Sequence, residues 1–107
     1  MANNYKNSKV DLSTTNVTTI YTAPSATQTV VKSLLVSNDS SSADTITVTI
    51  TDSAAAVFSV YKNEEVGALS SKELLSQPLV VMESEILKVT AATAGRLHVV
   101  ASYLEIT

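Results

Sequence analysis

The sequence contains no cysteine and no tryptophan, a single histidine, and only two glycines and two prolines. Without cysteine, neither a disulfide framework nor a thiolate metal site can form. Two glycines cannot make a glycine-rich phosphate loop, and no zinc-type ligand spacing is present. These absences remove the usual signatures of cofactor-dependent enzymes, so we expect no cofactor and no metal.

Positive charge and long apolar runs are also scarce. Seven Lys and Arg stand against ten Asp and Glu, which gives a formal net charge of −3. Such a chain gains no counterion-release energy on a phosphate backbone, so we expect no nucleic-acid partner. The longest apolar runs are about five residues, and residues 1–16 lack the apolar stretch of a secretory signal. We therefore expect no membrane partner either.

The chain is rich in Ser, Thr and β-branched residues that alternate with period two. In ADTITVTITDS, residues 43–53, the apolar Ile and Val side chains fall on one strand face and a row of Thr falls on the other. Similar segments recur at spacings of about 8–12 residues. We predict an all-β protein: an antiparallel β-sandwich, jelly-roll-like, with about eight strands.

Two segments need separate interpretation. NDSSSAD, residues 38–44, is a run of turn formers between two β-rich segments and predicts a hairpin. In SSKELLSQ, residues 70–77, Ser70 and Glu73 have capping-box spacing, which leaves a short helix open. A helix with room for barely two turns is marginal, so we favour a strand or loop there.

The N-terminal segment differs in composition from the remainder of the chain. Residues 1–16 are polar, with four Asn and few apolar side chains. Such a segment gains too little burial to offset its ordering entropy in isolation. We therefore predict an extended N-terminal arm at 1–16 and a β-sandwich domain at 17–107.

The sequence pattern does not predict any set of catalytic side chains close together in space. The nearest hydroxyl along the chain from His98 is Ser102, on the same face of one strand and roughly 13 Å away at about 3.4 Å per residue. The sequence leaves open a hydroxyl partner for His98 from another strand, but we interpret His98 as facing solvent or a neighbour. The carboxylate pairs lack any accompanying ligand set, so we interpret them as solvated charges. We expect no enzymatic activity and no catalytic residue.

The last strand carries apolar residues on both faces. In RLHVVASYLEI, Val99, Ala101 and Tyr103 share one face, whereas Val100, Leu104 and Ile106 share the other with His98 and Ser102. A face that mixes large aliphatics with small polar groups resembles an interface more than a dry core. We predict that Val100, Leu104 and Ile106 contact other subunits, and that Tyr5 and Val10 anchor the N-terminal arm on a neighbour.

The segment TVVKSLLVSN, residues 29–38, is two-sided in the same way. Its alternation predicts Val31 and Leu35 on one face, opposite Val30, Leu34 and Val36. Two-sided strands supply a second surface to bury, either under a covering loop of the same chain or against a partner. Both readings stay open. The Thr row is interpreted as a soluble strand face rather than a ligand site.

From residue 21 onward the chain resembles a group of small tailed-phage virion proteins. The resemblance is carried by a YTAP start, the VVKS strand ending in Asn38, and the Thr/Val ribbon at 45–52. It continues in LKVTAATA at 87–94 and in VVASYLEI at 99–106. One departure is Ser84-Glu85, where such proteins commonly have a Gly-Asp turn.

The resemblance implies a non-enzymatic structural component located in the virion, either decorating the capsid or associated with the tail. Its implied partners are copies of itself and other virion proteins, such as major capsid or tail subunits. The alternative is a receptor- or glycan-binding module at a fibre tip. A sugar site would normally need aromatic platforms, and the aromatic residues here are one Phe and four Tyr.

Overall fold

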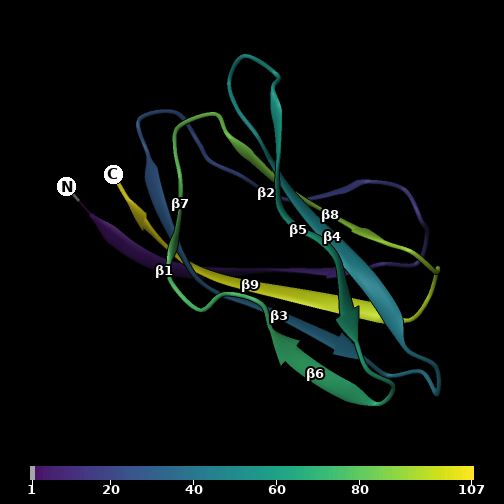
Figure 1. The fold of residues 1–107 in the computed structure, drawn as a ribbon. Helices are drawn as coiled ribbons and strands as arrows, with labels where there is room; N and C mark the ends of the chain where they lie inside the picture. The colour runs from purple at the N-terminus through teal and green to yellow at the C-terminus, as the bar shows by residue number, and fades with distance from the viewer. Residues whose placement is uncertain (1) are drawn as a thin grey trace.

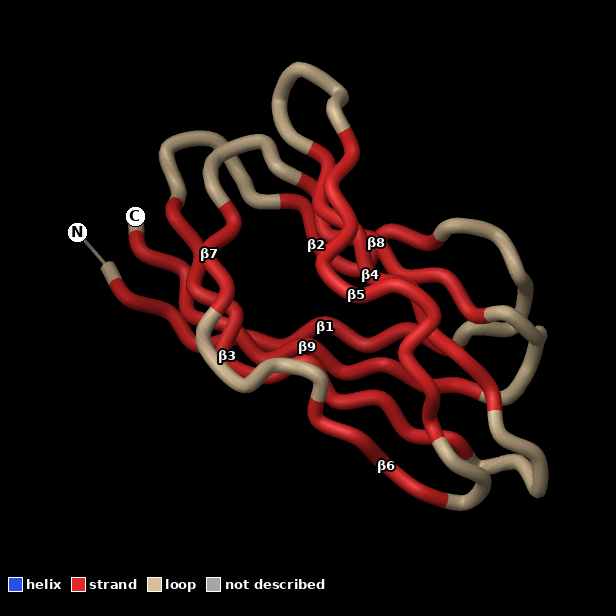
Figure 2. Tube along the Cα trace, viewed as in Figure 1, coloured by secondary structure: helices blue, strands red, loops and turns tan. Residues whose placement is uncertain are grey.

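The computed structural model of the protein describes residues 2–107. Within these residues it contains nine β-strands joined by loops, and no helix (Figure 1, Figure 2). No segment between Ala2 and Thr107 is a helix that could cross a membrane. In chain order the strands are β1 (Asn3–Asp11), β2 (Thr18–Thr22), β3 (Gln28–Asn38), β4 (Asp44–Thr51), β5 (Val57–Val66), β6 (Ser70–Glu73), β7 (Leu79–Val81), β8 (Ile86–Ala91) and β9 (Leu97–Ile106).

The strands form two antiparallel sheets that pack face to face. Sheet A has the order β1-β9-β3-β6, with β7 also paired to β3, and sheet B has the order β2-β8-β4-β5. The chain changes sheet at every connection except β4–β5 and β6–β7, which is the connectivity of a jelly roll. Because β6 and β7 pair with opposite halves of β3, they act as one interrupted edge strand. The predicted jelly-roll-like sandwich of about eight strands is confirmed.

The core lies between the two sheets, and β9 shows how the sequence builds it. Leu97, Val99, Ala101 and Tyr103 are buried, while the residues between them are half-buried on the outer face. This alternation follows the predicted period of two. Side chains from sheet B, including Val48 and Leu87, complete the core and are fully shielded from solvent.

Strand β3 departs from the predicted alternation. Its pairing with β9 shifts between Val31 and Ser33, so that Lys32 is an extra, bulged residue. The shift brings Val31 into the core together with Leu34 and Val36, whereas Val30 and Leu35 lie outside. The prediction that Val31 and Leu35 share a face was therefore wrong, because one inserted residue reverses the parity of the remaining strand.

The N-terminal segment is a strand of the sandwich and not a separate arm. Residues Asn3–Asp11 pair with β9 along their whole length, and Leu12, just beyond them, is buried. The predicted division into an arm at 1–16 and a domain at 17–107 is corrected accordingly, with Met1 outside the described residues. Backbone hydrogen bonds to β9 supply the stabilisation that the polar side chains of β1 lack.

Two connections bear on the other predictions. The run at 38–44 does not close a hairpin, because β3 and β4 belong to different sheets. Instead, the Asn38 side chain donates to the carbonyls of Ser42 and Val66 and so holds the crossover in place. The hairpin of this region is β4–β5. The 70–77 segment forms strand β6 followed by a loop, as favoured.

The Ser84-Glu85 departure does not prevent a tight turn between β7 and β8. The Glu85 backbone N–H donates to the Met82 carbonyl at 3.0 Å, and Glu85 Oε1 accepts from the Met82 N–H at 2.8 Å. Ser84 adopts a φ of 67°, in the left-handed region where glycine is favoured. The turn thus forms with backbone strain at Ser84.

Candidate protein-binding face

Four apolar side chains form a continuous row across the outer face of sheet A. Tyr5 of β1 is directly opposite Leu104 of β9, Leu104 is opposite Val30 of β3, and Val30 is opposite Val80 of β7. Directly opposed residues of antiparallel strands project to the same side of the sheet. The register therefore places all four on one face, and we call them the apolar row.

The apolar row is exposed at both ends and partly buried in the middle. Tyr5 is 74% exposed and Val80 is 50% exposed, while Leu104 and Val30 are half-buried between their neighbours. Exposed apolar groups that gather over several strands, rather than singly, are typical of surfaces that bind another protein. In the apolar row this exposure is concentrated at the two ends, Tyr5 and Val80.

Further apolar residues extend the row along the strands. Ile106 and Val100 belong to the same outer face of β9 and are half-buried, and Leu35 is opposite Val100. Of the sequence-predicted interface residues, Tyr5, Val100, Leu104 and Ile106 therefore lie together on the outer face of sheet A. This grouping comes from the register of β1 and β9, since Tyr5 and Leu104 are far apart in the sequence.

Val10 does not belong to the apolar row. It is opposite Val99, one of the fully buried residues, and packs against the core from β1. Val30 and Val80 belong to the row but were not predicted as interface residues. The alternation of β3 could have indicated Val30, whereas the pairing of β7 with β3 has no sequence signal.

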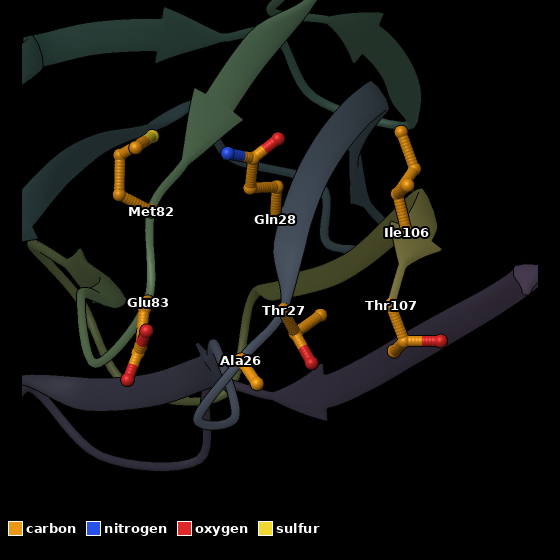
Figure 3. Close-up of a pocket in the computed structure, with 7 residues that line it drawn as sticks. All are labelled: Ala26, Thr27, Gln28, Met82, Glu83, Ile106 and Thr107. Atoms are coloured by element: carbon orange, nitrogen blue, oxygen red, sulfur yellow. The ribbon is translucent and has the colours of Figure 1, made fainter. Parts of the chain in front are cut away.

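Two surface hollows flank the apolar row. One, of about 370 Å³, lies at the end of the sandwich where both termini emerge, and Figure 3 shows the side chains that line it. Ile106 and Thr107 come from the end of β9, Gln28 from the start of β3, and Met82 from the turn after β7. The other, of about 320 Å³, contains Tyr5 among its lining residues. Hollows beside exposed apolar residues give a partner's side chains a place to insert.

Charged groups occupy the opposite end of the same sheet face. His98 Nε2 lies 3.3 Å from Asp11 Oδ1, and its Nδ1 lies 3.8 Å from Asp39 Oδ2. Ser102 is on the same outer face of β9 but borders the hollow near Tyr5. His98 is therefore flanked by two carboxylates, and Ser37 of β3 is directly opposite it in the register without a hydrogen bond to it. Within residues 2–107 no cluster of His, Asp and Glu could hold a metal ion.

A buried polar network lies beneath the apolar row, on the inner side of sheet A. Glu105 is 5% exposed and accepts a hydrogen bond from the Tyr21 hydroxyl at 2.6 Å. Its other oxygen, Oε1, lies 2.8 Å from Lys6 Nζ. The Tyr21 hydroxyl also contacts Thr29 Oγ1 at 2.7 Å. Sheet B is thus tied to sheet A through Tyr21, and β1 is tied to β9 through Lys6.

The ionisation of this network follows from its contacts. The hydrogen bond from Lys6, and then that from Tyr21, lowers the pKa of Glu105. Burial and the hydrogen bond to Glu105 raise the pKa of Tyr21, so its phenol stays protonated and donates. The hydrogen bond with Glu105 raises the pKa of Lys6. Each pKa shift favours the protonation state that the existing hydrogen bonds require, as expected of a structural network.

Sequence reasoning did not identify this network. Glu105 continues the inner-face parity of Val99, Ala101 and Tyr103, so the alternation of β9 carried a signal for a buried carboxylate. Its partners Lys6 and Tyr21 come from β1 and β2, Thr29 of β3 joins the network through Tyr21, and no spacing in the sequence links them.

Comparisons with known proteins bear on the fold alone. No protein-family model and no curated protein matches the sequence. Among solved structures, the chain is similar to a protein from Bacillus endospore appendages, described as a novel family of disulfide-linked pili. The TM-score is 0.60 at 10% sequence identity, covering 99% of this chain and 87% of that chain. At this identity the similarity establishes a shared β-sandwich fold.

Proposed function

We propose that this protein is a non-enzymatic structural subunit of a bacteriophage virion that decorates the capsid or belongs to the tail. It acts by binding copies of itself and other virion proteins, such as major capsid or tail subunits. The observation that carries the proposal is the apolar row, which crosses four strands of sheet A and is exposed at both ends.

The composition of the apolar row suits repeated protein contacts. Tyr5 offers a large ring with a polar hydroxyl, the kind of side chain enriched at the centres of interfaces. Burial of a residue such as Leu104 stabilises a contact by about 1.5–3 kcal/mol relative to exposure. In a symmetric assembly the same contact recurs in every copy, so the stabilisation from one small patch is repeated throughout the particle.

The fold similarity supports a role in assembly without specifying the particle. The Bacillus appendage protein is described as forming disulfide-linked pili, whereas this chain contains no cysteine. Disulfides cannot hold an assembly of the present chain together, which places more weight on contacts such as the apolar row. The assignment to a virion depends on the resemblance to tailed-phage virion proteins from residue 21 onward.

Locating the protein in purified particles tests this function. Antibodies against the chain would be used for immunogold electron microscopy of purified phage, with mass spectrometry of the same particles. We expect labelling at regular positions on the capsid or tail. A protein that is abundant in infected cells but absent from washed particles would contradict the proposal.

A further inference from the structure

The outer face of sheet B, on the opposite side of the sandwich from the apolar row, contains a groove of about 440 Å³. Its floor consists of Thr47, Thr49 and Thr51 of β4 together with Lys88 and Thr90 of β8. Val17 and Val57 form its apolar walls and are 63% and 62% exposed. The volume is within the range of small-molecule sites.

The register of sheet B concentrates the polar groups of the groove. Thr49 is directly opposite Lys88, and Thr47 is directly opposite Thr90. Paired residues of adjacent strands lie about 5 Å apart, so one ligand can contact an ammonium and several hydroxyls at once. The row of threonines, interpreted from the sequence as a soluble strand face, therefore borders a site with a positive charge at its centre.

Polar groups in this groove lack partners within the protein. No carboxylate of residues 2–107 forms an ion pair with Lys88, although the chain carries a net negative charge. Thr51 is 7% exposed, and its Oγ1 is a buried oxygen without any hydrogen-bond partner. Thr47 alone is engaged, through contacts with Asn63. Because that oxygen is buried, a ligand in the groove cannot reach it, and Lys88, Thr49 and Thr90 are the polar groups left to bind one.

We propose that this groove binds an acidic sugar, a uronate or sialate residue. The carboxylate of the sugar pairs with Lys88, a charge-assisted contact that is stronger than a neutral one. The sugar hydroxyls bond to the hydroxyls of Thr49 and Thr90, and its C–H face packs on Val17 and Val57. A carboxylate, several hydroxyls and an apolar ring face are the three features that the groove complements.

The inference is independent of the proposed virion role, because the groove and the apolar row lie on different sheets. A subunit held to a particle through sheet A would leave sheet B facing outward, available to a glycan. No aromatic platform is present in the groove, so the affinity for one sugar residue is expected to be weak, with a Kd of about 1 mM.

Amide chemical shifts of the full-length, ¹⁵N-labelled protein test the proposal during titration with glucuronate and, separately, N-acetylneuraminate. We expect saturable shifts confined to the groove residues on β4 and β8 and to its walls at Val17 and Val57, with at least one of the two sugars. Glucose serves as the uncharged match and acetate as the carboxylate without a sugar ring, and both should bind at least tenfold more weakly.

Two groove variants and one control variant assign the binding to the groove. Lys88→Gln should weaken binding at least tenfold, and Lys32→Gln, the same change on sheet A, should leave it unchanged. Thr49→Val, which retains the shape but removes a hydroxyl, should also weaken it. The remaining amide spectrum reports whether each variant is folded. Shifts located elsewhere, equal binding of glucose or acetate, or tighter binding of a Glu-rich peptide than of either sugar would overturn the proposal.

Discussion

Lys6 and Glu105 form an ion pair, 2.8 Å between Nζ and Oε1, that joins the edge strand β1 to β9. The Glu105 carboxylate is buried, whereas the Lys6 side chain is 54% exposed. The remainder of β1 is mainly polar and exposed. Lys6 therefore supplies one of the few side-chain contacts that hold the N-terminal strand, and a buried carboxylate depends on it.

The first prediction concerns the pH dependence of this pair. The pKa of Glu105 is below its ordinary value of 4.5, so its contribution to stability is present above pH 4.5 and is lost as the pH falls through the lower, folded-state value. Lys6→Met should lower the melting temperature at pH 7. The difference from the parent should shrink at acid pH, as Glu105 becomes protonated in both proteins.

Lys9→Met is the matched control, because Lys9 lies on the same strand and forms no ion pair among the described residues. It should have little effect at either pH. Thermal unfolding followed by circular dichroism at several pH values measures both variants. A Lys6→Met effect that does not change with pH would show that the side chain acts through packing rather than charge.

The second prediction concerns strand β1 as a whole. Deletion of residues 2–10 removes the pairing partner of β9 and exposes Tyr103 and Glu105 at a new sheet edge. The melting temperature should fall, and the shortened chain should aggregate more readily, because an unpaired edge is a template for further pairing. An unchanged melting temperature would mean that β1 contributes no stability to the isolated domain.

The third prediction uses backbone strain in the β4–β5 hairpin. Ala55 has a φ of 66°, and Asp52 holds the turn by accepting from the N–H groups of Ala54 and Ala56, each at 2.9 Å. Ala55→Gly should raise the free energy of unfolding by about 0.5–1 kcal/mol, because glycine adopts this conformation without steric cost.

Ala54→Gly in the same turn is the control for Ala55→Gly. Ala54 is not in the left-handed region, so glycine there adds only unfolded-state entropy and should lower stability. Urea denaturation of the two variants beside the parent provides the measurement. If both substitutions shifted stability in the same direction, strain at Ala55 would not be the cause.

The alternation of apolar residues predicted those strands of the fold in which the alternation is regular. In β9 the period of two holds for all ten residues, so both the inner residues and the outer face with Leu104 could be predicted. It failed in β3, where a bulge at Lys32 interrupts the alternation and the Glu73 side chain contacts the residues just after it. The Glu73 carboxylate accepts from the Leu34 N–H at 2.7 Å, and it lies 39 residues further along the chain.

The N-terminal strand could not be predicted for a different reason. Its side chains have neither the apolar alternation nor the β-branched character of the other strands, and it is held by backbone pairing with β9. The same pairing decides where the candidate site residues lie. It brings Tyr5 beside Leu104, as a shared interface requires, and turns Val10 toward the core.

The fourth prediction tests the central claim, that the apolar row is a protein-binding face. Light scattering of the parent should give a mass above that of one chain, and Leu104→Glu should reduce it without altering the β-sheet circular dichroism. Leu69→Glu, the same change at a loop residue that is 73% exposed, should leave the mass unchanged. Tyr5→Glu, at the exposed end of the row, provides a second variant if Leu104→Glu fails to fold. A parent that is monomeric and does not bind purified particles through this face would contradict the account.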